Sequence, residues 1–184
     1  MKVLYVTRKY RPSVGGMQQI NTDLVASLRG KADVDLIALG RGQRHLAWFL
    51  PYALLRGAWR RCDVIHLGDG LLAPLGWLLS AIRRRPYTLT LCGLEITYRN
   101  RLYRSVVLPF IRKADRIVCI SHSTLKLALA NGCDAARCIV IPCGVRAECL
   151  ERASREAARA RLVERFGVPP GDLILLSVGR LVRR

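Results

Sequence analysis

Short apolar segments alternate with helical segments along almost the whole chain, and this alternation restricts the fold more than any other feature of the sequence. The apolar segments are rich in Val, Ile and Leu on both faces, which is typical of strands in a parallel sheet covered on both sides. They are residues 3–7, 34–39, 64–67, 87–91, 116–120, 138–141 and 173–178. The segments with helical spacing or composition are residues 16–29, 45–60, 71–83, 101–113, 121–130 and 154–166. Repeated strand–helix units predict an α/β fold, a Rossmann-like parallel sheet with helices on both faces.

One strong linker signal, the sequence VPPGD at residues 168–172, separates the last predicted helix from the last predicted strand. Proline and glycine at this density end a helix and favour a turn. We therefore expect residues 1–167 to form one Rossmann-like domain, with residues 168–172 as an interdomain linker. Residues 173–184 are then expected to hold the first strand of a second domain, the rest of which this chain lacks.

The chain is strongly basic, with 31 Lys and Arg against 13 Asp and Glu in 184 residues and a formal net charge of +18. Hydrophobic residues make up 51% of it, which excludes a disordered basic tail. The charge implies an anionic partner: nucleic acid, an anionic membrane surface or phosphorylated small molecules. Because the cations are spread over many helices and no nucleic-acid-binding motif occurs, we do not expect a nucleic-acid partner.

The apolar runs and the cysteines both indicate the cytoplasm. The N-terminus has no signal-peptide pattern, and the longest uncharged apolar runs, residues 45–55 and 70–82, are shorter than a membrane-spanning helix. The seven cysteines are odd in number and form no CxxC pair, which favours reduced thiols in a core over a zinc site. We therefore expect a cytoplasmic protein without a bound metal.

The loop between the first predicted strand and helix carries the cations Arg8, Lys9 and Arg11 and ends in two adjacent glycines, Gly15 and Gly16. Glycines at a helix N-terminus let a ligand approach the backbone, and free N–H groups with the helix dipole favour an anion such as phosphate. The alternative is a loop whose backbone needs a positive φ angle.

The sequence GDGLLA at residues 68–73 fits the GxGxxA pattern of dinucleotide-binding folds. In those folds the pattern follows the first strand, with an acidic residue at the end of the next strand. Here it follows the third predicted strand, and the only later acid in range is Glu95. We therefore do not expect a nicotinamide cofactor.

Five stretches of the sequence follow one another in the order found in a known family. Residues 12–18, PSVGGMQ, are similar to a Pro-x-x-Gly-Gly-x-Glu/Gln loop, and residues 90–95, TLCGLE, to a Thr-x-His-Gly-x-Asp/Glu motif. Three further stretches also match. Residues 114–121, ADRIVCIS, are similar to a strand-to-helix segment of that family, and residues 139–145, IVIPCGV, to its Pro-Asn-Gly turn. Residues 176–181, LSVGRL, are similar to its first C-terminal strand. Together they resemble the N-terminal half of a retaining glycosyltransferase of glycosyltransferase family 4, whose members have the two-domain GT-B fold.

The resemblance implies an enzyme that transfers a sugar from a nucleotide-diphosphate sugar to an acceptor, such as a lipid-linked or cell-envelope glycan, with retention at the anomeric carbon. In this family the missing C-terminal domain binds the donor, so this acceptor-binding half is expected to be inactive alone. No cofactor is expected besides the nucleotide sugar itself. Expected site residues are Gly15, Gly16 and Arg180 at the donor phosphates, Cys92 and Glu95 at the reacting centre, and Arg8, Gln18, His66 and Gly93 near the acceptor.

Cys92 departs from the family, which has a histidine beside the reacting sugar at this position. A thiol does not supply the paired donor and acceptor of a neutral imidazole. Two interpretations remain open: an active enzyme with Cys92 in its cleft, or a non-catalytic module that binds an acceptor or a membrane. His66, at the end of the third predicted strand, is either an acceptor contact or a residue of the fold.

Aromatic residues and arginines occur together in the predicted helix 45–60, which contains Trp48, Tyr52, Arg56 and Trp59. Tyrosines and arginines also occur together at 98–104, and residues 83–85 are three consecutive arginines. Tryptophan, tyrosine and arginine suit the headgroup layer of an anionic bilayer. The alternative is an aromatic helix that faces the core and has a solvated basic rim. We expect peripheral attachment to the inner face of the plasma membrane.

Overall fold

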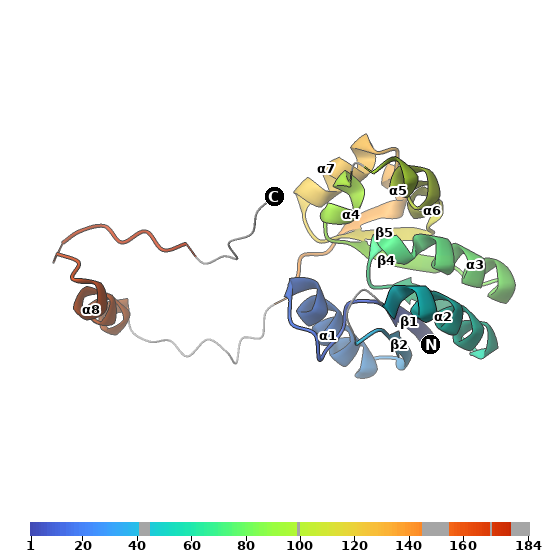
Figure 1. Ribbon diagram of the computed structural model, residues 1–184, viewed down its shortest axis with the longest axis horizontal. Helices are drawn as coiled ribbons and strands as arrows, with labels where there is room; N and C mark the ends of the chain where they lie inside the picture. Colours follow the sequence, from blue (N-terminus) through green and yellow to red (C-terminus); the bar gives the residue numbers. More distant parts are fainter. Residues whose placement is uncertain (41–44, 99, 145–154, 170, 178–184) are drawn as a thin grey trace. The chain divides into compact units, whose positions relative to one another are not determined.

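The structure is a computed structural model, and it describes residues 1–40, 45–98, 100–144, 155–169 and 171–177. The chain divides into two compact units, Met1–Cys143 and Gly144–Arg184. The first unit contains a six-stranded sheet in the order β2-β1-β3-β4-β5-β6, in which every neighbouring pair is parallel (Figure 1). The strands are β1 (Lys2–Thr7), β2 (Asp33–Ala38), β3 (Val64–Leu67), β4 (Tyr87–Leu91), β5 (Arg116–Cys119) and β6 (Cys138–Val140). The predicted α/β sheet is confirmed.

Helices cover both faces of the sheet, and alternate side chains of β1 show which helix lies on which face. Tyr5 donates a hydrogen bond from its hydroxyl to Oδ1 of Asn21 in α1 (Gly16–Arg29), at 2.6 Å. Leu4 points the other way, toward α2 (Leu46–Trp59) and α3 (Ala73–Arg83). A Cβ on Gly57 of α2 would lie 3.3 Å from Cδ2 of Leu4 and 2.9 Å from Cδ2 of Leu79 in α3. This glycine therefore lets α2 pack closely against both the sheet and α3.

The predicted helix over residues 101–113 is interrupted. The chain forms α5 (Arg101–Val106) and α6 (Leu108–Lys113), which meet at Val107. Pro109 lies in the first turn of α6, where its missing N–H is tolerated, but it cannot donate to the carbonyls at the end of α5. The other elements of this unit are α4 (Leu94–Thr97), α7 (His122–Ala130) and the 3₁₀ turns η2 (Gly70–Leu72) and η3 (Ala135–Arg137).

The second unit contains α8 (Arg155–Phe166), and its described residues 172–177 have no regular secondary structure. The strand predicted over 173–178 is therefore not formed in its described part. A strand forms by pairing with a neighbour, and no strand pairs with this segment among the described residues. The first compact unit ends at Cys143, earlier than the predicted limit at residue 167. The domain limits of the whole protein stay a prediction.

No helix in the described part of the chain is long and apolar enough to cross a bilayer.

Candidate functional site

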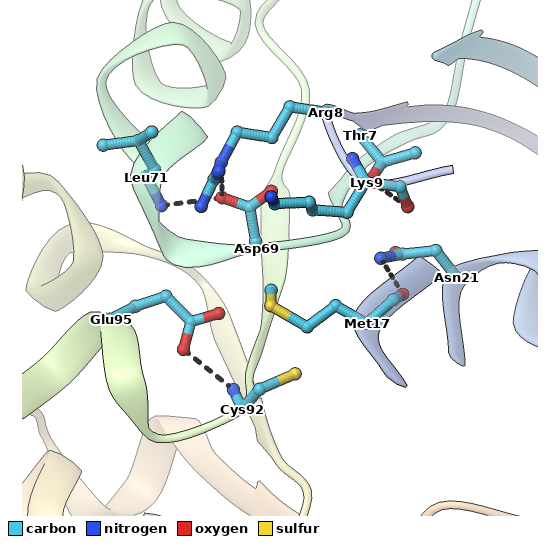
Figure 2. A network of polar contacts seen from close by, with 9 residues as sticks. All are labelled: Thr7, Arg8, Lys9, Met17, Asn21, Asp69, Leu71, Cys92 and Glu95. Atoms are coloured by element: carbon cyan, nitrogen blue, oxygen red, sulfur yellow. Dashed lines mark hydrogen bonds and ion pairs between the residues drawn. The ribbon is translucent and has the colours of Figure 1, made fainter. Parts of the chain in front are cut away.

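The carboxyl ends of β1, β3 and β4 lie next to one another because these strands are neighbours in a parallel sheet. The residues just beyond them, Arg8, Asp69 and Cys92, therefore gather at one edge of the sheet, together with Glu95 of α4 (Figure 2). Open parallel sheets bind their ligands at this edge. Three of these four residues were predicted site residues, and Asp69 was not.

Arg8 and Asp69 form a buried ion pair. Nε of Arg8 lies 3.0 Å from Oδ1 of Asp69, and the two side chains are 13% and 0% exposed. The same Oδ1 accepts a hydrogen bond from the backbone N–H of Leu71 at 3.1 Å, whereas the buried Oδ2 has no partner. Burial raises the pKa of Asp69, and Arg8 opposes that shift. The pair fixes the Arg8 guanidinium, a group whose forked N–H donors suit an anion, at the edge of the sheet.

The glycines on either side of Asp69 are explained by packing. A Cβ on Gly68 would overlap Oδ1 of Asn21 and lie 2.7 Å from Oγ1 of Thr7. A Cβ on Gly70 would lie 3.0 Å from Cδ2 of Leu91 and 3.3 Å from Cβ of Glu95. The GDG sequence therefore brings β3, α1 and α4 close together and places a carboxylate between them. The available sequence signal was an acid between two glycines directly after a predicted strand, where open parallel sheets bind ligands.

Gly93 and Glu95 shape the turn after β4. Gly93 has a φ of 101°, a conformation that favours glycine. Oε2 of Glu95 accepts a hydrogen bond from the backbone N–H of Cys92 at 3.2 Å. Glu95 is 6% exposed, and its Oε1 is buried without a partner. Burial raises the pKa of Glu95, which makes this carboxyl a candidate proton carrier.

Cys92 is a protonated thiol rather than a thiolate. Burial, with a further contribution from Glu95, raises its pKa to about 12. At neutral pH the thiol is therefore a weak hydrogen-bonding group and a poor nucleophile. It does not supply the paired donor and acceptor of a neutral imidazole.

Cys92 is expected to react about a thousandfold more slowly with iodoacetamide than an unperturbed thiol near neutral pH, because its thiolate fraction is lower by that factor. Peptide mapping by mass spectrometry over a time course measures this rate. Cys143, which is exposed, provides the internal comparison within the described residues and should be alkylated first. Alkylation of Cys92 as fast as Cys143 would contradict the buried, neutral thiol.

The N-terminus of α1 has no cap from its own sequence. Its N-cap residue is Gly15, which has no side chain to accept a hydrogen bond from the first N–H groups, and no acidic residue lies in the first turn. Gly15 has a φ of 161°, which is close to 180° and therefore extended backbone that any residue adopts. Neither Gly15 nor Gly16 has the left-handed conformation that favours glycine, so the explanation by a positive φ angle is wrong. A Cβ on Gly16 would meet nothing within 4 Å. The first N–H groups of α1 therefore receive no side-chain cap, and a helix end of this kind favours an anion.

The side chains of Gln18 and Met17, in the first turn of α1, point in different directions. A Cβ on Gly15 would contact the Gln18 side chain, so Gln18 folds back against the helix start. Figure 2 shows the Met17 side chain pointing from α1 toward Cys92 and Glu95. Met17 therefore points toward the candidate site, although only its glycine and glutamine neighbours were predicted site residues.

His66 is engaged within the fold. Its Nδ1 lies 2.7 Å from Oγ1 of Thr88, its Nε2 lies 3.1 Å from Oγ1 of Thr90, and its ring centroid lies 5.0 Å from that of Tyr5. Burial lowers the pKa of His66 to about 4, so the ring is neutral at physiological pH. Because both ring nitrogens already have partners, this geometry favours a residue of the fold over an acceptor contact.

One predicted site residue, Arg180, lies outside the described residues. The sheet edge thus brings together Arg8, Cys92, Gly93 and Glu95 with the glycines of α1, and adds Asp69. Among the described residues, no group of three or more His, Cys, Asp or Glu side chains is placed to hold a metal ion. The arrangement offers an anion site and two buried carboxyls of raised pKa.

Solved structures with a similar fold include a protein in complex with UDP or UDP-glucose and a galactosyltransferase. Anabaena Alr3699/HepE in complex with UDP, and the same protein with UDP-glucose, each match with a TM-score of 0.65 at 17% identity, over 91% of this chain and 50% of theirs. The apo form of the lipopolysaccharide outer core galactosyltransferase WaaB matches with a TM-score of 0.54 at 12% identity, over 84% of this chain and 50% of its own. This chain therefore spans about half the length of those structures, and at these identities the likeness shows the fold alone, which is that of one half of the GT-B architecture.

The sequence comparison is more specific than the fold. No curated protein sequence matches the chain significantly. However, residues 3–144, which include all of the sheet except Lys2 and every described site residue, match the family model of the glycosyl transferase 4-like domain. The chain belongs to the glycosyl transferase 4-like domain family.

Proposed function

We propose that this chain is the acceptor-binding half of a retaining, family-4-like glycosyltransferase that takes its sugar from a nucleotide-diphosphate donor. The observation that carries the proposal is the convergence of three features on one sheet edge: the uncapped N-terminus of α1, the fixed guanidinium of Arg8 and the buried carboxyl of Glu95. Family membership supports it, as do the UDP and UDP-glucose named for the Alr3699/HepE structures.

The residues of this edge have distinct roles in the proposed reaction. The N–H groups at Gly15 and Gly16 and the guanidinium of Arg8 stabilise negative charge on the substrates. Glu95, with its raised pKa, lies near the reacting centre. It exchanges a proton with the substrates or accepts a hydrogen bond from the hydroxyl of the sugar acceptor. The acceptor hydroxyl attacks from the face that the nucleotide leaves, and cationic groups, with Arg180 expected among them, stabilise the departing phosphate.

The acceptor is proposed to be a lipid-linked or cell-envelope glycan, and the protein to be cytoplasmic and peripheral on a membrane. The name of WaaB, a lipopolysaccharide outer core galactosyltransferase, supports an envelope acceptor. The second half of the enzyme, which binds the donor, is proposed to follow residue 184. No cofactor or metal is proposed besides the nucleotide sugar.

A second candidate function is a non-catalytic module that binds an acceptor or a membrane. The observation that favours it is Cys92, a neutral thiol where the resembled family has a histidine. A thiol contributes little to proton transfer at neutral pH, so a catalytic role of this position is lost unless Glu95 performs it.

The test is nucleotide release by the full-length protein that contains this chain, measured with a panel of UDP-, GDP- and ADP-sugars and envelope glycan acceptors. Under the proposal, one donor is consumed, and Glu95→Gln lowers kcat at least about a hundredfold, the usual contribution of a positioned acid or base. Asp33→Asn, in an exposed ion pair with Lys2, is the control and leaves kcat unchanged.

Two outcomes decide between the candidates. Turnover that depends on Glu95 supports the enzyme. No turnover with any donor, together with turnover gained in Cys92→His, supports a module that has lost its catalytic residue.

A further inference from the structure

Helix α2 exposes a stripe of large apolar side chains. Trp48, Tyr52, Leu55 and Trp59 follow one another at spacings of four, three and four residues, which places them on one face of the helix. They are 81%, 53%, 65% and 86% exposed. The opposite face of α2, with Phe49, Ala53 and Gly57, is buried. The aromatic side chains of α2 therefore do not face the core, except for Phe49, which contradicts the alternative of a core-facing aromatic helix. We call the four exposed residues the α2 stripe.

Helix α3 extends this apolar face and brings its end beside the end of α2. It exposes Leu78 and Ile82 and packs against α2 through Leu79 and Gly57. Nη1 of Arg83 donates a hydrogen bond to the backbone carbonyl of Ala58 at 3.3 Å, which joins the C-terminal turns of the two helices. Two tryptophans more than four-fifths exposed on one helix are unusual for a surface that meets only water.

Arginines gather where α2 and α3 end. Arg56, Arg61, Arg84 and Arg85 are exposed, and within the described residues the only ion pair at these helix ends joins Arg60 to Asp35, at 3.2 Å. Neither α2 nor α3 contains an aspartate or a glutamate. We call Arg56, Arg61, Arg84 and Arg85 the arginine end. An apolar stripe beside uncompensated positive charge, with no carboxylate on either helix, is complementary to an anionic and partly apolar surface.

We propose that the α2 stripe and the arginine end dock this protein on an anionic lipid bilayer, with α2 lying in the plane of the headgroups. The stripe inserts among the headgroups and upper acyl chains, and the arginines bind lipid phosphates. A second copy of the chain would cover the stripe but would leave the arginine end without an anionic partner, because neither α2 nor α3 carries a carboxylate. A nucleic acid would neutralise the arginines but leave Leu55 and the tryptophans in water.

This docking mode places the candidate site beside the membrane, and in that respect it rests on the proposed function. In a parallel α/β unit the helix runs back against its strands, so α2 begins at the carboxyl edge of the sheet, where the site lies. Trp48 is therefore at the site end of the stripe, and Trp59 and the arginine end are at the far end, about 20 Å along the helix. A lipid-linked acceptor would reach the site edge without leaving the bilayer.

Vesicle binding tests the proposal with the chain alone and requires neither a donor nor turnover. The chain is mixed with sucrose-loaded vesicles of phosphatidylcholine, or of phosphatidylcholine with phosphatidylglycerol, and the sedimented fraction is measured. We expect binding to the anionic vesicles, weakened at high salt, and at least tenfold weaker binding to neutral ones. Trp48→Ala with Trp59→Ala, and separately Arg61→Gln with Arg84→Gln, should each lower the partition coefficient about tenfold or more.

Matched variants on other surfaces control for general effects. Leu129→Ala with Ile139→Ala removes exposed apolar side chains elsewhere, and Arg29→Gln with Lys126→Gln removes exposed charges elsewhere. Both pairs should bind like the unchanged chain, and circular dichroism should show that all four double variants are folded. The chain has three tryptophans, so in Trp77→Phe the emission of Trp48 and Trp59 alone should shift to shorter wavelength on anionic vesicles.

Three results would overturn the proposal. They are equal loss of binding in the stripe and control variants, equal binding to neutral vesicles, and self-association through the stripe, seen by light scattering, without vesicle binding. Because turnover is not measured, failure here leaves the glycosyltransferase proposal intact, and failure of the nucleotide-release test leaves this one intact.

Discussion

Replacing Asp69 by alanine is expected to lower the free energy of unfolding by about 3–5 kcal/mol, as is usual when one partner of a buried ion pair is removed. Arg8 stays protonated, and its side chain is only 13% exposed, so the variant leaves a nearly buried cation without its carboxylate. It also removes the acceptor for the N–H of Leu71. Urea denaturation followed by circular dichroism measures the change as a shift of the transition midpoint.

Two variants isolate the cause. Asp33→Ala breaks an ion pair whose partners, Lys2 and Asp33, are 60% and 67% exposed, and it should change stability by less than about 1 kcal/mol. Asp69→Asn keeps an oxygen acceptor for Arg8 and Leu71 but loses the charge, so it should lie between alanine and the unchanged protein. Equal losses in Asp33→Ala and Asp69→Ala would contradict a buried pair that holds Arg8 in place.

The local pattern was sufficient for most of the fold. Apolar runs with flanking glycines or caps predicted β3, β4 and α1 at their observed limits, because each segment buries its apolar residues against immediate neighbours in the sheet. The break at Val107 was missed, although Pro109 is a local signal for it. The predicted strand at 173–178 has the right composition, but a strand also needs a partner, which its own sequence does not specify.

The candidate site was only partly predictable. Gly93 and Glu95 could be placed by a motif whose residues are close in sequence. The pair of Arg8 and Asp69 spans 61 residues and depends on β1 and β3 being neighbours, so spacing alone could not show it. Burial could not be read from the sequence either, because a histidine at a strand end suits a ligand contact or an internal hydrogen bond. The contacts of His66 with the two threonines on β4 favour the second role.

His66 is expected to make the protein less stable in mild acid. Its pKa is about 4 in the folded protein, against 6.5 for an unperturbed imidazole. Between these values the unfolded chain binds a proton that the folded chain does not, so stability falls as the pH falls from about 6.5 toward 4. The contribution of His66 is fully present above about 6.5, and about 2–3 kcal/mol of it should be lost by a pH near 4.5.

Urea denaturation near neutral pH and in mild acid, with His66→Gln as the variant, isolates this contribution. Asp69 and Glu95 have raised pKa values, so the folded protein takes up their protons first and their contributions increase stability on acidification. These opposing contributions are common to both proteins and cancel in the difference. The acid-induced loss should therefore be smaller in His66→Gln, whereas His122→Gln, on the exposed side of α7, should behave like the unchanged protein. Equal acid sensitivity of all three, or an NMR titration in which His66 is protonated above about pH 6, would contradict a neutral histidine held by Thr88 and Thr90.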